Sequence, residues 1–180
     1  MTSAEPSKTR GNKIAFISGP LFPPENYFET HYLPHLHAAI SQEHNFVVGP
    51  APGIDTVSLH YLLTLIPASR ITVYLARFEA VARRSSYAPF EATGGKIVVE
   101  GATTGERDAA MTRDSDHDIL RYMPEDEARA FYGPAYLPRV TNTEKNERRR
   151  KREPLHYNPA LEKAEKEKER DGKWWRELRW

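Results

Sequence analysis

Short apolar runs recur along most of the chain and alternate with segments of helical periodicity. The runs are residues 13–18, 46–48, 70–76, 96–99 and 119–123. Each is short and apolar, which is typical of strands buried on both faces. Strands that alternate with helices pair in parallel through right-handed crossovers. We therefore predict a Rossmann-like α/β fold: a doubly wound, mostly parallel five-stranded sheet with helices on both faces, followed by a charged helical extension at the C-terminus.

Apolar residues at helical spacing predict helices between these strands, over residues 28–40, 53–65 and 107–115. Pro34 lies inside the first of them and is expected to kink it or to start a second helix. The second is expected to be largely buried, with His60 as a core residue rather than a ligand. The polar stretch between residue 76 and Gly95 looks irregular.

Charge divides the chain into a body and a tail. Residues 141–180 hold 13 Lys or Arg against 9 Asp or Glu, whereas residues 1–140 hold 13 against 16. We predict a disordered segment at 1–12, a Rossmann-like domain at 13–152 and a charged helical tail at 153–180. A helix is expected to begin near residue 141, with Thr141 or Thr143 as its N-cap.

The tail permits two interpretations. Five basic residues at 148–152 and three tryptophans near the end would suit phosphate contacts with a nucleic acid or docking on a partner protein. Lys and Glu nearly balance after Pro159, however, which favours a solvated or oligomer-bridging helix.

Composition excludes several kinds of site. The chain has no cysteine, so disulfides, thiolate metal sites and a cysteine nucleophile are absent. His31 and His35 would share a helix face only if the helix survived Pro34, and no H-E-x-x-H pattern occurs, so neither a metal nor another cofactor is expected. Because the first residues carry no apolar signal run, a cytoplasmic protein without membrane association is expected.

Two strand-to-helix turns are the best candidates for a ligand site. Ser18 and Gly19 follow the first strand, and Gly49 ends the second strand before a turn through Gly53. In open α/β sheets, ligands bind at the carboxyl ends of the strands, and free amides at a helix N-terminus favour an anion. The helix after Gly53 would therefore hold a phosphate, unless its first-turn residues Asp55 and Thr56 only cap it.

The helix at 107–115 supplies candidate carboxylates. Asp108 lies in its first turn and Asp116 directly follows it. Either side chain could bind ribose hydroxyls or act as a general base, although charged residues on a surface helix are usually only solvated.

Four segments in this order resemble the SLOG superfamily of Rossmann-like nucleotide sensors and nucleotide-processing enzymes. They are Ile17-Ser-Gly19, Phe46-Val-Val-Gly-Pro-Ala-Pro-Gly-Ile-Asp-Thr56, Arg107-Asp-Ala-Ala-Met-Thr-Arg-Asp-Ser-Asp116 and Asn142-Thr-Glu-Lys-Asn146. The superfamily includes cytokinin-activating phosphoribohydrolases, 2'-deoxynucleoside 5'-phosphate N-hydrolases and the DNA-processing protein A domain.

The resemblance implies roles for these segments. Ser18 and Gly19 would lie under the nucleoside, and Gly49, Gly53, Asp55 and Thr56 would form a second wall. Asp116 would face the same crevice, and Asn142, Thr143 and Asn146 would supply a late phosphate-binding turn. A homodimer or larger assembly is implied as well.

The chain departs from the family at the catalytic positions. The Pro-Gly-Gly-x-Gly-Thr run of the phosphoribohydrolases is missing, and Glu29, Glu91 and Glu106 are only loosely placed substitutes for a catalytic glutamate. Asp116 or Asp108 would then be the carboxylate. The leading hypothesis is a nucleotide-binding domain that hydrolyses the base–sugar bond of a nucleoside monophosphate. The alternative is a non-enzymatic sensor or scaffold whose tail mediates oligomerisation or nucleic-acid binding.

Overall fold

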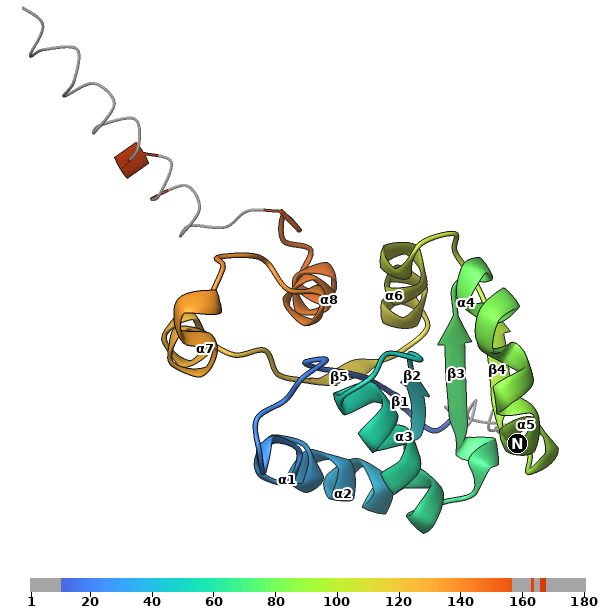
Figure 1. Cartoon of the computed structure of the whole chain (residues 1–180). Coiled ribbons are helices and arrows are strands. Elements are labelled where there is room, and N and C mark those ends of the chain that lie inside the picture. Colours follow the sequence, from blue (N-terminus) through green and yellow to red (C-terminus); the bar gives the residue numbers. More distant parts are fainter. Residues whose placement is uncertain (1–10, 157–162, 164–165, 168–180) are drawn as a thin grey trace, which may run out of the picture. The chain divides into compact units, whose positions relative to one another are not determined.

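The structure is a computed structural model that describes residues 11–156, 163, 166 and 167 (Figure 1). It divides into two compact units, Met1–Leu120 and Arg121–Trp180. Residues 1–10 of the predicted N-terminal segment and most of the predicted tail, including its tryptophans, lie outside the described residues.

The first unit contains a five-stranded parallel sheet, which confirms the predicted fold class. Its strands are β1 (Ile14–Ser18), β2 (Asn45–Val48), β3 (Ile71–Leu75), β4 (Lys96–Val99) and β5 (His117–Leu120), arranged in the order β4-β3-β2-β1-β5. The chain runs outward from β1 to β4 and then returns to place β5 on the other side of β1. The predicted fifth strand at 119–123 was wrong by two to three residues, because His117 and Asp118 already pair with β1.

The helices of this unit are α1 (Tyr27–His31), α2 (Leu33–Ser41), α3 (Ile54–Leu65), α4 (Arg77–Arg83), α5 (Ala88–Ala92) and α6 (Thr104–Arg113), with short 3₁₀ turns at Ala68–Arg70 and Arg84–Tyr87. Pro34 lies in the first turn of α2, where proline is tolerated, so it marks a second helix start. The prediction of an irregular stretch up to Gly95 was wrong. Two helices lie there, each too short to give a clear helical period.

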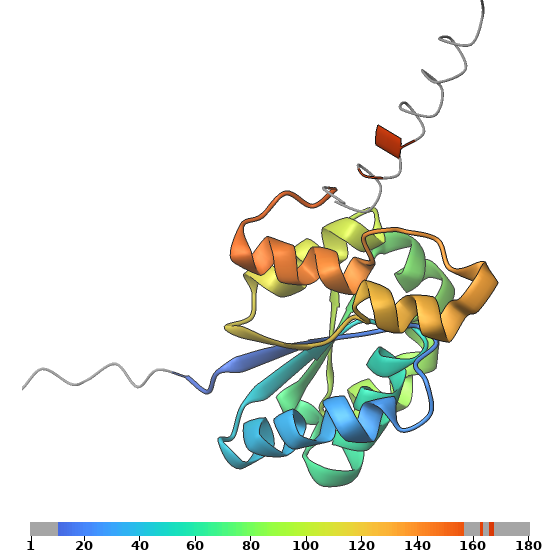
Figure 2. The same ribbon diagram turned by 90° about the vertical axis from the view of Figure 1, so that its left-hand side faces the viewer.

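Both faces of the sheet are covered. On one face, Phe16, Val47 and Tyr74 form a cluster with Ala110 and Met111 of α6. Figure 2 places α6 on the opposite side of the sheet from α1, α2 and α3. Side chains of one strand alternate between faces, so the neighbours of these three residues point toward the other helix layer. Strands buried on both faces explain the unbroken apolar runs of the sequence.

The second unit consists of α7 (Glu125–Tyr132), a 3₁₀ turn at Gly133–Ala135 and α8 (Asn142–Lys151). Thr141, one of the two residues predicted as an N-cap, caps α8. Its hydroxyl accepts a hydrogen bond from the backbone N–H of Glu144 at 3.1 Å. Among the described helices, none has the length and apolar character needed to cross a bilayer.

Basic side chains of α8 are already engaged within the second unit. Arg148 pairs with Glu144 at 2.6 Å, and Lys151 pairs with Glu147 at 3.1 Å. Arg149 donates to the amide oxygen of Asn146. These pairings reduce the free positive charge that a nucleic acid would need.

Candidate functional site

The carboxyl ends of β1, β2 and β3 lie level with one another in the first unit. The register aligns Ile17 with Val48, and Val48 with Val73. The direction of strand addition reverses beside β1, and ligands of open α/β sheets bind at the carboxyl ends near such a reversal. Ser18 and Gly49, the residues at the ends of β1 and β2, therefore occupy a favourable place for a site.

The turns after β1 and β2 pack backbone against backbone. A Cβ on Gly19 would lie 2.6 Å from Cβ of Ile54, and a Cβ on Gly53 would overlap the backbone of Pro20 and Leu21. Gly53 also has a φ of 79°, which favours glycine. Both glycines thus allow the two turns to touch.

The N-terminus of α3 is partly occupied by protein. The backbone N–H of Ile54 donates to the carbonyl of Pro20 at 3.1 Å. The hydroxyl of Thr56 donates to the carbonyl of Ala51 at 2.7 Å, and Gly53, the N-cap, forms no side-chain cap. Thr56 therefore closes the turn and does not cap the helix, and the amide of Ile54 is not available to a phosphate.

Asp55 is buried at this contact between turns, with 6% of its surface exposed. Burial, and after it the charge of Asp108, raise the pKa of its carboxyl to about 8, against opposing effects of Arg107 and of a hydrogen bond from the backbone of Gly19. Asp55 therefore holds a proton at neutral pH, within reach of the strand ends.

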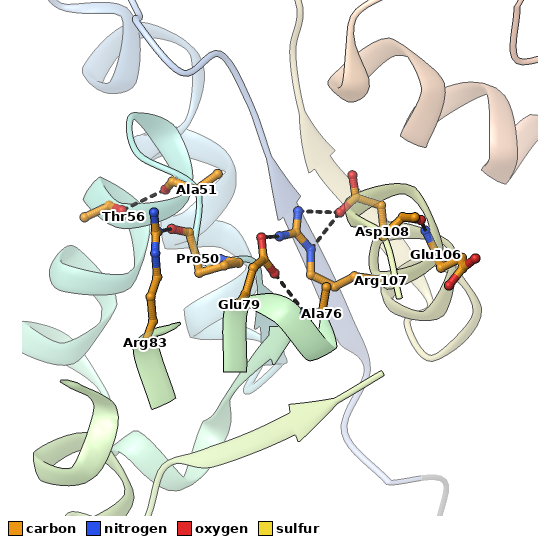
Figure 3. A network of polar contacts seen from close by, with 10 residues as sticks. Pro50, Ala51, Thr56, Ala76, Glu79, Arg83, Glu106, Arg107 and Asp108 are labelled. Carbon is orange, nitrogen blue, oxygen red and sulfur yellow. Dashed lines mark hydrogen bonds and ion pairs between the residues drawn. The ribbon is translucent and has the colours of Figure 1, made fainter. Parts of the chain in front are cut away.

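Arg107 links two further buried carboxylates (Figure 3). Its Nη1 donates to Oε1 of Glu79 at 2.5 Å, and its Nη2 and Nε donate to Oδ1 of Asp108 at 2.7 and 3.0 Å. Glu79 in turn accepts the backbone N–H of Ala76, just past the end of β3, at 2.8 Å. One guanidinium thus pairs with two buried carboxyl groups, close to a third carboxyl that is protonated.

Arg83 and Tyr87 lie at the border of this acidic cluster, defined as Asp55, Glu79 and Asp108 around Arg107. Arg83 is exposed and donates from Nη1 to the carbonyl of Pro50 at 3.0 Å. Burial raises the pKa of the Tyr87 phenol, which is also influenced by the charges of Arg83 and of the cluster. An arginine with remaining N–H donors therefore adjoins the turn after β2.

The prediction that Asp116 faces the same crevice was wrong. Its Oδ2 accepts the backbone N–H of Ile14 at 2.7 Å, and its own N–H donates to the carbonyl of Ile14 at 2.8 Å. Asp116 thus lies at the amino end of β5, opposite the edge that carries Gly19. A residue that connects a helix to the start of the next parallel strand lies at the amino edge. Asp108, in the N-terminal half of α6, pairs with Arg107 of the cluster at the other edge.

The residues predicted for a late phosphate-binding turn all lie on α8 in the second unit. Thr143 and Asn146 are buried there, and Asn142 is the first residue of the helix. The three glutamates considered as substitutes are not members of the acidic cluster: Glu29 is exposed on α1, Glu91 pairs with Arg84, and Glu106 accepts the backbone N–H of Ala102 at 2.5 Å. His60 is exposed, so its prediction as a core residue was wrong.

Sequence reasoning did not select Glu79 or Arg107 as site residues. Glu79 lies four positions after the end of β3. Because the carboxyl ends of parallel strands share one edge, the turn after β3 was as good a candidate as the turns after β1 and β2. Arg107 was noted only as a polar helix residue. Arg107 is only 5% exposed, and no feature of the sequence pattern predicts that this charged residue is buried.

The first unit thus defines a Rossmann-like α/β domain with a buried acidic cluster at the carboxyl edge of its sheet. No protein-family model, curated protein or solved structure matches the chain. Within the described part of the chain, no group of three or more His, Asp or Glu side chains is arranged to hold a metal ion.

Proposed function

We propose that the first unit binds a nucleoside monophosphate at the carboxyl edge of its sheet and hydrolyses the bond between base and sugar. The observation that carries the proposal is the acidic cluster. Asp55 is protonated at neutral pH, while Asp108 forms a buried ion pair with Arg107. A protonated carboxyl beside a carboxyl that is paired with a cation is suited to act as the acid, with its partner as the charge stabiliser.

The chemistry assigns one task to each carboxyl. Asp55 donates its proton to a ring nitrogen of the base as the C1'–N bond breaks, and the electron pair of that bond stays on the base. Asp108 stabilises the positive charge that develops on the sugar, as carboxylates do in glycoside hydrolysis. Water adds its oxygen to C1' and returns a proton to Asp55. The products are a free base and a sugar 5'-phosphate.

The phosphate requires a cation. Arg83 fits this role because it is exposed and lies against the turn after β2. Only one of its N–H groups is used there, as a donor to the carbonyl of Pro50, so its other N–H groups can bind a phosphate. Guanidinium groups form paired hydrogen bonds with phosphate oxygens. The segments quoted above for the SLOG superfamily support the same ligand class, and membership of that superfamily is part of this proposal.

The test is incubation of the full chain with a panel of ribo- and deoxyribonucleoside 5'-monophosphates, followed by chromatography of the free bases. Equilibrium dialysis on the same panel measures binding separately. Release of a base by the wild type, lost in Asp108→Asn and retained in Asp126→Asn, is the expected result. Binding without release would favour the sensor alternative. Neither binding nor release would remove the nucleotide proposal.

A further inference from the structure

A pocket of about 790 Å³ lies in the first unit between α3 and the segment that contains α5. Its lining residues come from three places: Gly49 directly after β2, the helix α3 with the connection after it, and the 3₁₀ turn at Arg84–Tyr87 together with α5 and its C-cap. Apolar side chains form most of the wall, namely Leu59, Leu63, Ile66, Pro67, Pro89 and Phe90.

The pocket adjoins the acidic cluster at Gly49. A Cβ on Gly49 would lie 2.8 Å from Oδ2 of Asp55 and 3.4 Å from Cζ of Arg107. Gly49 thus lines the pocket and also lies against these two groups. The pKa of Tyr87, another lining residue, responds to the charges of Glu79 and Asp55.

The polar groups of the lining restrict what the pocket can hold. It contains no Lys, Arg, Asp or Glu, so nothing in it offsets the cost of burying a phosphate. The hydroxyls of three lining residues, Thr56, Ser86 and Thr93, already donate hydrogen bonds to backbone carbonyls. The hydroxyl of Tyr87 forms no hydrogen bond with any residue that the structure describes, and His60 offers a second uncommitted polar group.

We infer that this pocket binds the base of the nucleotide, an uncharged heteroaromatic ring. Apolar walls contact its faces, and the phenol hydroxyl of Tyr87 bonds its polar edge. Bound there, the base lies beside Gly49, the residue that adjoins the protonated Asp55. This inference rests on the proposed function and adds where the base lies.

Leu63→Glu tests the inference, with Leu65→Glu as the matched control. Both leucines lie on α3 and are partly exposed, at 39% and 51%, but only Leu63 lines the pocket. Binding of the nucleoside monophosphates and of the matching nucleosides is measured by equilibrium dialysis. Leu63→Glu should weaken both at least ~10-fold, about the effect of 1.4 kcal/mol, while Leu65→Glu stays within about twofold of wild type. Circular dichroism of each variant confirms that it is folded.

Tyr87→Phe supplies a second measurement that leaves the ring in place. It should weaken the nucleoside and its monophosphate by the same factor, since the hydroxyl contacts the base and not the phosphate. Wild-type affinity in folded Leu63→Glu, together with loss of nucleotide binding in Arg83→Ala, would overturn the pocket inference and leave the proposed function standing. A wild-type chain that binds no member of the panel would overturn both.

Discussion

Oδ2 of Asp55 lies 2.8 Å from the point that a Cβ atom on Gly49 would occupy. Real Cβ atoms essentially never approach another heavy atom so closely. The buried carboxyl therefore sits where it does because the residue at the end of β2 has no side chain. Gly49 is thus a positioning residue for the acidic cluster.

Gly49→Ala should displace the Asp55 carboxyl and weaken nucleotide binding by roughly tenfold, the effect of about 1.4 kcal/mol. Equilibrium dialysis measures the affinity and thermal unfolding measures stability. Gly11→Ala is the matched control, because a Cβ there would meet nothing within 4 Å. Equal affinities in the two variants would contradict a positioning role for Gly49.

Arg107→Met should lower the free energy of unfolding by about 3–5 kcal/mol, since it leaves the carboxylates of Glu79 and Asp108 buried without a cation. Arg113→Met removes an arginine from the same helix whose ion pairs with Glu100 and Asp114 are solvent-accessible, and should lower the free energy of unfolding far less. Urea unfolding compares the two. Similar losses would mean that the cluster around Arg107 is not buried in solution.

Asp55 should make the folded protein less stable as the pH rises. Its pKa is about 8 in the folded chain against 3.8 for an unperturbed aspartate, so between these values the unfolded chain releases a proton that the folded chain keeps. The free energy of unfolding attributable to this group therefore falls by up to about 1.4 kcal/mol per pH unit from pH 4 to pH 8. Asp55→Asn should abolish that slope, whereas Asp126→Asn, on an exposed part of α7, should retain it. Urea titrations at several pH values measure the difference.

Asp116→Asn should leave nucleotide binding within about twofold of wild type, because the residue lies at the amino edge of the sheet. Asp108→Asn should abolish release of the base, since it removes the carboxylate that pairs with Arg107. Binding and base release of both variants are measured on the same nucleotide by dialysis and chromatography. Loss of base release in Asp116→Asn but not in Asp108→Asn would favour Asp116, the other carboxylate considered from the sequence.

The strands of the sheet could be predicted from the sequence, but the residues that form the acidic cluster could not. Short runs such as residues 46–48 identify buried strands because parallel pairing leaves no polar face, and Pro34 marked the start of α2. The role of Glu79 could not be read in this way. Its place depends on the ion pair with Arg107, 28 residues further along the chain, and periodicity carries no information on such a contact.

Asp55 illustrates the same limit. The sequence placed it correctly in the first turn of α3 and suggested either a cap or a phosphate site. Its raised pKa arises from burial and from the charge of Asp108 on α6, which only the tertiary structure brings near. Local pattern predicts where a helix begins, whereas the protonation state of a buried carboxyl depends on neighbours distant in sequence.

The protonated state of Asp55 is the claim on which the proposed chemistry depends, and carboxyl ¹³C NMR measures it directly. The Asp55 signal, assigned by its disappearance in Asp55→Asn, is followed from pH 4 to pH 9 in the full chain. The account predicts a midpoint near pH 8, from the value that burial and Asp108 impose. A midpoint near pH 4 would mean an ionised carboxylate at neutral pH, and the proton donor of the proposed reaction would be lost.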